Sequence, residues 1–376
     1  MIVITENFGQ LIVLTTPVLA SMTETISFKT DVFESKNGSE HRTPLKDNAR
    51  QSFDISTQAY KTELARFFNE QWGGIRANWA IPLYHESQKI DAVTGFIVDC
   101  RTDIFSFYDG GLALIKTGES FYVAEIETVE PNGLTLKNEI DIDESEIMPI
   151  RVCFISGDIS RNIGTFHANA SMSFVVIDEP DLIESVPHQF LNNDIYYFFL
   201  TYTGDSIETT LTQQQNIIDD EVGIIYQDSD WLHARYSKQY TKFITNKDEL
   251  HEYKQFLFRR MGQYRPFWLP LYENNIRIKN TGNITTTLQI EADAYKVLSN
   301  QRKHIAIKSD DGWTAHTITA STATTLTISP ALNKQSTSVK YISYLGLHRL
   351  NADSITLNHN GANIVEASVP IIEIGV

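Results

Sequence analysis

Residues 73–84 read GGIRANWAIPLY, and residues 262–272 read GQYRPFWLPLY. The two stretches share a glycine, an arginine, a tryptophan and a Pro-Leu-Tyr ending, although the chain has only five tryptophans. Aligned on their identical residues, they pair Gly73 with Gly262, Arg76 with Arg265, Trp79 with Trp268, Pro82 with Pro270 and Tyr84 with Tyr272. In this alignment the first copy holds one extra residue between its tryptophan and its proline. Repetition of this kind indicates an internal duplication.

A helix is expected before each copy. Before the first copy, apolar residues recur at spacings of three and four: Leu64, Phe67, Phe68 and Trp72. With Ser56-Thr57 as a start signal, this spacing predicts a helix over about 57–72.

The segment before the second copy has the same pattern with clearer ends. Its apolar positions are Leu250, Tyr253, Phe256, Leu257 and Met261. Asn246 is placed to cap the helix, and Glu249 occupies the third helical position, where an acidic residue completes a capping box. Gly262 follows as a stop signal. These features predict a helix over about 247–261.

Strands are expected after each copy. Residues 115–136 align without a gap on residues 307–328, at an offset of 192. Both segments alternate apolar and polar residues and are rich in threonine, isoleucine and valine, which is typical of strands in antiparallel meanders. Turn signals at Asn37-Gly38, Asp109-Gly110-Gly111 and Pro131-Asn132-Gly133 divide the strands of the first half.

The repeat predicts two tandem homologous units, residues 1–185 and residues 186–376, and a mainly β (α+β) fold. Each unit is expected to be a β sandwich or split barrel with one flanking helix and a second small antiparallel β module. The modules are expected over about 90–180 and about 280–376. The joint between the units is expected near 178–192, where proline and acidic residues cluster without apolar periodicity.

Composition indicates a packed globular protein. Apolar residues make up 42% and aromatic residues 11% of 376 residues, which is enough for two substantial cores. The two cysteines, Cys100 and Cys153, lie in apolar strand-like runs, so we expect buried thiols and neither a disulfide nor a metal site. The formal net charge of −16 argues against a nucleic-acid grip, because phosphate binding needs a basic surface.

The apolar N-terminal segment is interpreted as strand. Residues 1–21 lack a basic leading region, and Glu6, Asn7 and Gln10 interrupt them, so they match neither a signal peptide nor a membrane span. A protein made in the cytoplasm, without membrane insertion, is expected.

No catalytic, cofactor-binding or metal-ligating constellation is recognised. Gly204-Asp205-Ser206 is interpreted as a hairpin turn, because nothing else supports a nucleophile there. The ten histidines share no helical face. The acidic run 139–146 lacks the ordered oxygen spacing of a calcium loop, so a solvated loop is expected. We therefore predict that the protein is not an enzyme and has no cofactor.

The repeated residues are given structural roles. Gly73 and Gly262 are expected to allow a left-handed turn after each helix. Trp79 and Trp268 are expected to supply buried apolar area. Pro82 and Pro270 are expected where a strand meets an edge or a bulge. Arg76 and Arg265 pair with an acid either within the fold or across a subunit boundary; both alternatives stay open.

A broader pattern resembles a known family. It runs G-x-E-x-R, then an arginine and an aromatic residue, then a helix ending L-x-x-F-F before G-x-x-R-x-x-W. The matching residues are Gly38, Glu40, Arg42, Arg50, Phe53, Leu64, Phe67, Phe68, Gly73, Arg76 and Trp79. This order is similar to the tail-tip proteins of long non-contractile-tailed bacteriophages, in particular the distal tail protein and related baseplate-hub components. The second half keeps the helix, Gly262, Arg265, Trp268 and Pro270 but not the G-x-E-x-R segment.

The resemblance implies a virion protein of the tail tip or baseplate, without catalytic residues, whose copies form a ring around the tail channel. The family typically has one such domain per chain, so the duplication implies a trimer with a pseudo-six-fold ring, or else a hexamer. Implied partners are further copies of itself and the tail tube, tape measure and baseplate hub or fibre proteins, while DNA passes through the channel without specific binding. The alternative is a glycan- or receptor-binding β module of a viral adhesion device.

Overall fold

The computed structural model describes the chain except residues 16–17, 61–62, 178–185, 198–208, 232–233, 292–294, 296–301, 362–363 and 375–376. The expected mainly β fold is confirmed: strands in large antiparallel sheets dominate, with two α-helices among the described residues. The expected joint falls partly on 178–185, and Gly204-Asp205-Ser206 falls wholly on 198–208, so both lie outside the described residues. We call the described residues up to 177 the first unit and those from 186 the second unit.

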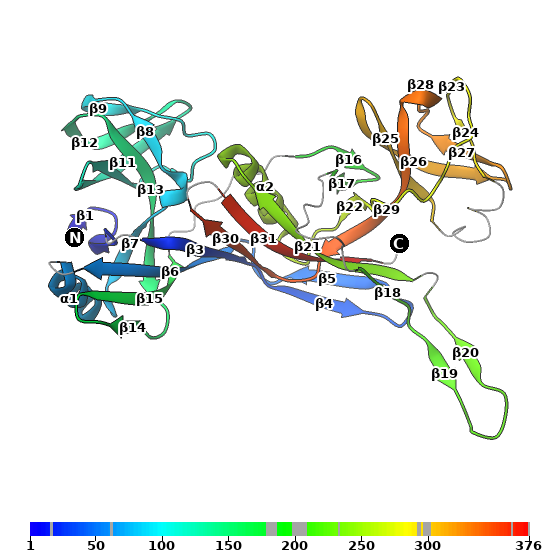
Figure 1. The fold of residues 1–376 in the computed structure, drawn as a ribbon, viewed down its shortest axis with the longest axis horizontal. Helices are drawn as coiled ribbons and strands as arrows, with labels where there is room; N and C mark the ends of the chain where they lie inside the picture. Colours follow the sequence, from blue (N-terminus) through cyan, green and yellow to red (C-terminus); the bar gives the residue numbers. More distant parts are fainter. Residues whose placement is uncertain are drawn as a thin grey trace.

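Most of the first unit lies at one end of the elongated molecule (Figure 1). Its elements are β1 (Ile2–Thr5), β2 (Gly9–Val13), β3 (Val18–Ser27), β4 (Thr30–Glu34), β5 (Glu40–Pro44), β6 (Arg50–Tyr60), α1 (Leu64–Gly74), β7 (Asn78–Pro82), the 3-10 turn η2 (Tyr84–Glu86), β8 (Gln88–Ile90), β9 (Val93–Asp99), β10 (Leu112–Thr117), β11 (Ser120–Glu130), β12 (Gly133–Ile142), β13 (Ser145–Ile155), β14 (Ser160–Ile163) and β15 (His167–Val176).

The second unit occupies the other end (Figure 1). Its elements are β16 (Gln189–Phe190), β17 (Asn193–Ile195), β18 (Thr209–Thr212), β19 (Asn216–Ile218), β20 (Tyr226–Asp228), β21 (Arg235–Ile244), α2 (Lys247–Arg260), β22 (Phe267–Pro270), β23 (Asn283–Ile284), β24 (Thr287–Gln289), β25 (His304–Ser309), β26 (Gly312–Ser321), β27 (Thr325–Ser329), β28 (Lys334–Gln335), the 3-10 turn η3 (Ser336–Ser338), β29 (Val339–Leu350), β30 (Ser354–Asn360) and β31 (Ile364–Glu373).

The strand pairings of the two units repeat. In the first unit β6 pairs with β15, β15 with β13, and β13 with both β7 and β10. In the second unit β21, β31, β29, β22 and β25 pair in the same order. Even an irregularity recurs, because the register shifts between Ile126 and Thr128 in one meander and between Ile318 and Ala320 in the other. The chain is therefore built from two units of one topology.

The two units are joined edge to edge within one sheet. Strand β3 of the first unit pairs with β6 on one side and with β30 of the second unit on the other. A continuous run of antiparallel strands follows, in the order β14, β15, β6, β3, β30, β31, β21, β18 (Figure 1). Each unit contributes four strands to it.

The largest core belongs to the second unit but takes residues from both. Helix α2 packs on β21, β22 and β31 through Leu250, Tyr253, Phe256 and Leu257. Ile26, Phe28 and Ala49 of the first unit complete this core. In the first unit the corresponding apolar residues form two smaller clusters, one around Trp79 and one beneath α1. The core of the second unit therefore depends on the junction.

Two local predictions are wrong. The first helix begins at Leu64 and not near 57, because residues 57–60 continue β6, with Thr57 and Ala59 buried between strands. The acidic run 139–146 is mostly strand: it ends β12 and starts β13, leaving only residues 143–144 between them, and its Ile140 is buried. In both places alternating inward side chains favour strand over the local helix or loop signal.

The second helix matches its prediction closely. It spans Lys247–Arg260, and the Asn246 side chain accepts a hydrogen bond of 2.8 Å from the backbone N–H of Glu249. Met261 and Gly262 both adopt left-handed backbone conformations after it, with φ of 50° and 65°. The expected Asn246 cap and Gly262 stop signal are therefore present, while the Glu249 carboxylate pairs with Lys242.

Candidate functional site

Five buried titratable side chains meet where the two units join. Glu24 lies on β3, His85 and Glu86 on η2, Lys254 on α2 and His359 on β30, and each is at most 6% exposed. We call these residues the junction cluster. Glu24 faces inward because it alternates with Met22 and Ile26, which are buried on the same face of β3.

Lys254 links carboxylates at the centre of the junction cluster. Its ammonium lies 3.0 Å from Glu24 Oε2 and 3.4 Å from Glu86 Oε1. Glu24 also accepts a 2.6 Å hydrogen bond from the Gln51 amide, and Glu86 accepts hydrogen bonds from the backbone and hydroxyl of Ser106. Because Glu24 and Glu86 belong to the first unit and Lys254 to the second, these contacts tie the units together.

Two histidines complete the cluster. The rings of His85 and His359 lie 4.0 Å apart, and His359 Nε2 is 2.9 Å from Glu24 Oε2. His85 Nε2 is 3.6 Å from Glu86 Oε1, and neither ring nitrogen of His85 makes a hydrogen bond to a described residue.

Burial and charge set the protonation states. Burial lowers the pKa of His85 to about 4, so its ring is neutral near pH 7. For Glu24 and Glu86, burial opposes ionisation, but the charge of Lys254, together with hydrogen bonds and the neighbouring histidines, outweighs burial and lowers both pKa values. Burial likewise opposes the charge of Lys254, and the two carboxylates overcome it and raise the lysine pKa. The cluster therefore holds two carboxylates around one ammonium.

Donor atoms of Glu24, His85 and His359 lie within 4.8 Å of one another, which is the spacing of metal ligands. However, the ammonium of Lys254 already lies against the Glu24 carboxylate, where a metal would bind. A metal ion at this point requires displacement of the lysine. The arrangement holds charged groups of the two units together in a buried joint.

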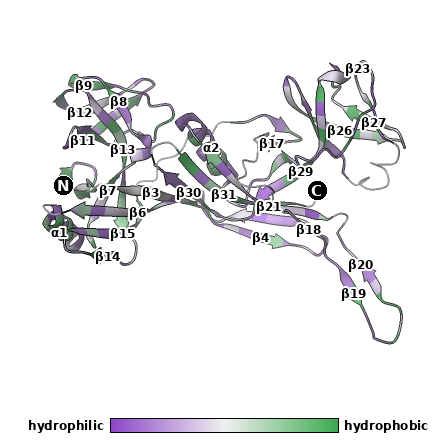
Figure 2. Cartoon of the chain, in the orientation of Figure 1, coloured by the Kyte–Doolittle hydropathy of each residue, from purple (hydrophilic) through white to green (hydrophobic). Residues whose placement is uncertain are grey.

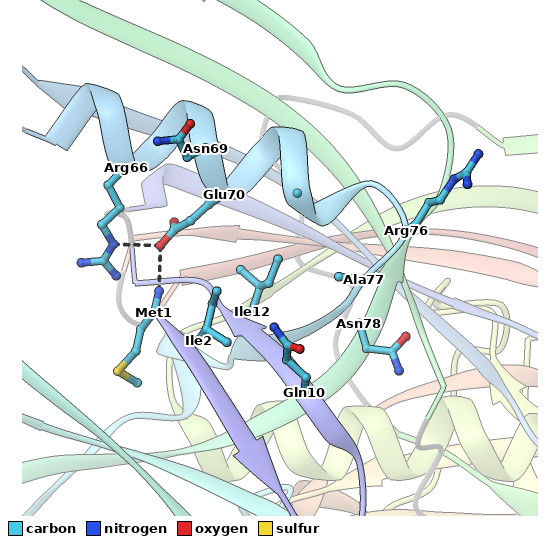
Figure 3. A pocket seen from close by; sticks show the side chains of 11 residues that line it. Met1, Ile2, Gln10, Ile12, Arg66, Asn69, Glu70, Arg76, Ala77 and Asn78 are labelled. Atoms are coloured by element: carbon cyan, nitrogen blue, oxygen red, sulfur yellow. Dashed lines mark hydrogen bonds and ion pairs between the residues drawn. The ribbon is translucent and has the colours of Figure 1, made fainter.

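Apart from the junction cluster, a hollow of about 900 Å³ opens beside α1 (Figure 3). Its lining includes Ile12, Asn69, Glu70, Gly73 and Asn78. The Glu70 carboxylate forms ion pairs with Arg66, at 2.8 Å, and with the amino group of Met1, at 2.7 Å (Figure 3).

The repeated glycines differ in role. Gly262 has a φ of +65°, and an added Cβ would come within 2.4 Å of Asp353 Oδ1. Gly73 lies inside α1 with open space around it, so its expected left-handed turn is wrong. The glycine required there is Gly74, because a Cβ on it would come within 2.3 Å of the Trp79 ring, whose Nε1 donates to the Gly74 carbonyl.

The expected equivalence of Trp79 and Trp268 is also wrong. Trp79 pairs with Cys153 in the sheet, whereas the residue of β22 in that register is Phe267, paired with His348. Successive residues of a strand face opposite sides, so the two indoles lie in different cores. The extra residue of the first copy therefore lies before its tryptophan and not after it. Counterparts in β7 and β22 differ by 188 in residue number throughout.

The remaining repeated residues follow the strand ends. Pro82 and Pro270 are the last residues of β7 and β22, beyond the point where β2 and β17 stop pairing, so within the described strands neither interrupts a ladder. Tyr84 donates to the Leu14 carbonyl at 3.1 Å, and Tyr272 packs edge-on against Trp313.

The two repeated arginines differ in exposure. Arg265 is half-buried and donates to the Arg259 carbonyl at 3.4 Å. Arg76 is exposed and is one of the residues that line the hollow beside α1 (Figure 3). Arg265 thus has a contact within the fold, and Arg76 lies at the surface.

Two sheet edges remain open. Strand β14 at one end pairs only with β15, and β18 at the other pairs only with β21, among the residues that the structure describes (Figure 1). All four residues of each strand are exposed. The hairpin β19–β20 projects beyond β18, and the loop at its tip contains hydrophobic residues (Figure 2). Its exposed large apolar residues are Ile217, Ile218, Val222, Ile224, Ile225 and Tyr226.

Comparison with known proteins gives no relative: no family model matches the chain, and no curated protein does. Within the described part of the chain, neither helix is long and apolar enough to cross a membrane.

Sequence reasoning missed the junction cluster, although two signals for it exist. Glu24 occupies an inward position of an alternating strand, and Lys254 lies on the apolar face of α2 beside Leu250 and Leu257. Charged residues at such positions indicate a buried ion pair. The partners come from distant segments, so spacing alone does not bring them together.

Proposed function

We propose that this chain is a structural component of a bacteriophage tail tip or baseplate. Copies of it form a ring around the tail channel and join the tail tube to the hub or fibres. The role is architectural and involves no catalysis.

One observation carries the proposal: two units of the same topology are fused edge to edge through β3 and β30 in one sheet. Related units that meet head to tail form either closed rings or open filaments. The internal joint is one step of such an arrangement, already made within the chain. Three chains then supply six units, which match a six-fold tube above and a three-fold spike or fibre below.

Two further features support this role. The arginine and tryptophan motif around Arg76 and Trp79 resembles that of the distal tail proteins. The net charge of −16 suits a channel wall that DNA slides past, because like charges prevent adhesion.

Electron microscopy of phage particles that carry this chain tests the assignment. Gold-labelled antibodies against the chain are expected at the distal end of the tail, at the tube terminus. Label on the capsid, along the whole tube, or absent from purified particles contradicts the assignment.

The alternative is a glycan-binding module, for which an exposed aromatic platform is needed. Trp72 is the most exposed aromatic residue of the first unit, at 70%, but the Arg161 guanidinium lies over its ring at 5.2 Å. We therefore favour a protein partner at that face. Binding of host-cell glycans by the isolated monomer would support the alternative.

A further inference from the structure

We infer that the open β18 edge and the β19–β20 hairpin of one chain dock on the β14 edge and the adjoining α1 face of a second copy. The contact repeats, between chains, the joint that β3 and the β4–β5 hairpin make within the chain. This inference rests on the proposed ring and assigns its contact surfaces.

The internal joint supplies the template. Ile26 of β3 lies opposite Ile355 of β30, is 1% exposed and completes the core of the second unit. Beyond it, the β4–β5 hairpin lies along the second unit. Arg235 donates to Glu34 at 2.7 Å, and Arg349 donates to Glu40 at 2.8 Å. Edge strand and hairpin thus act as one contact.

The open edges are the counterparts of the joined ones. Ser27 pairs with Arg50 in the first unit, and Thr212 pairs with Arg235 in the second. Counterparts in β3 and β18 therefore differ by 185 in residue number. Arg161 pairs with Ala170 in the first unit, and Leu357 pairs with Ala367 in the second. Counterparts in β14 and β30 therefore differ by 196 in residue number. Among the described residues, β18 has no strand in the position that β30 occupies beside β3, and β14 of a second copy has the matching position.

These offsets give the register of the contact. Leu211 is the counterpart of Ile26 but is 67% exposed. Its expected opposite residue is Ile159 of the second copy, which packs beside the small apolar cluster beneath α1. Leu211 would complete that cluster as Ile26 completes the larger core.

Charges on the two surfaces are complementary. The same difference of 185 in residue number makes Asp219, on the tip of the β19–β20 hairpin, the counterpart of Glu34. It also makes Arg50 of the first unit the counterpart of Arg235. Arg235 is 4% exposed beneath its hairpin, whereas Arg50 is exposed. The acidic tip Asp219-Asp220-Glu221 therefore has an arginine of the second copy to pair with, in the geometry that Glu34 and Arg235 display internally.

Both surfaces carry exposed apolar residues. On the hairpin, Val222 is 93% and Ile224 98% exposed. On the receiving side, Phe154, the counterpart of the covered Arg349, is 43% exposed, and Trp72 next to Gly73 is 70% exposed. Because β14 and β18 lie toward opposite ends of the sheet, the contact joins different chains (Figure 1).

Cysteine cross-linking tests the register. Thr25 and Thr356 lie directly opposite in the internal joint, with hydroxyl oxygens 3.5 Å apart. Their counterparts are Thr210 and Ser160, so the double variant Thr210→Cys/Ser160→Cys is expected to form disulfides between chains after mild oxidation. Thr212→Cys/Ser160→Cys is the control, because a diagonal pair two residues apart is too distant, at about 7–8 Å. Non-reducing gels of both variants measure the difference.

Two point variants test the energetics in the full chain. Leu211→Glu is expected to abolish association, while Ile97→Glu, at an equally exposed residue of β9, is expected to leave it unchanged. Asp219→Arg is expected to weaken association at least tenfold, and Arg50→Asp in the same chain is expected to restore it.

The outcomes separate this inference from the ring itself. If the unmodified chain forms a ring but Thr210→Cys/Ser160→Cys cross-links no more than its control, the contact is wrong and the ring stands. Equal effects of Leu211→Glu and Ile97→Glu overturn it in the same way. A chain that stays monomeric at all concentrations overturns both proposals.

Discussion

A single buried lysine balances the charge at the junction of the two units. Lys254 neutralises Glu24 and Glu86, which come from the other unit and have almost no exposed surface. A buried ion pair gains little over an apolar joint, but removal of one partner leaves an uncompensated buried charge. The junction cluster is therefore sensitive to loss of the lysine.

Lys254→Met is expected to destabilise the chain by about 3–5 kcal/mol, because two carboxylates remain buried without their cation. Urea unfolding at pH 7 measures this loss. Lys340→Met is the matched control, since Lys340 pairs with Asp310 at the surface and such a pair contributes about 0–1 kcal/mol. Equal losses in the two variants contradict the role given to Lys254.

His85 gives the joint a dependence on pH. Its folded-state pKa of about 4 lies below the ordinary 6.5, so the unfolded chain takes up a proton first as the pH falls. Stability is then lost between pH 6.5 and 4, by about 2 kcal/mol between pH 7 and 5. Glu24 and Glu86, whose pKa values are lowered, add losses only below their ordinary value of 4.5.

His85→Phe is expected to remove most of that loss between pH 7 and 5, because the phenyl ring has no proton to gain. The neighbouring groups His359, Glu86 and Lys254 remain in place. Urea unfolding at the two pH values measures it, with His41→Phe at an exposed strand position as the control. An unchanged loss in His85→Phe would show that other groups set the pH dependence.

At the scale of elements, the sequence predicts the ends of α2 but not the start of α1. Asn246, Glu249 and Gly262 act locally, and they predict α2 almost to the residue. The start of α1 was wrong because β15 pairs with residues 57–60, and that partner lies more than a hundred residues away. Local signals fail where a distant strand competes for the same backbone.

Gly262→Ala is expected to destabilise the chain by about 1–2 kcal/mol, because alanine is strained at a φ of +65° and its Cβ would clash with Asp353. Gly73→Ala, in the aligned sequence position, lies in a helix with open space and is expected to stabilise by up to about 1 kcal/mol. Thermal unfolding of both variants measures the contrast. The same sign for both would contradict the different roles given to the two glycines.

At the scale of the whole molecule, duplication was visible in the sequence, and the repeated pairings of the two units agree with it. The alignment nonetheless misplaced the extra residue, because identical tryptophans are a stronger sequence signal than the alternation of a four-residue strand. The junction cluster was not predictable from spacing, since its five members come from four elements of both units. The edge-to-edge joint likewise appears only once β3 and β30 are seen to pair.

The assembly itself provides the most direct measurement. The mass of the purified chain in solution, from light scattering coupled to size exclusion, is expected to be three times the 42.7 kDa of one chain. Electron microscopy of the same fraction is expected to show rings of six similar lobes around a channel. A two-fold dimer, or a monomer that persists at high concentration, would contradict the head-to-tail account.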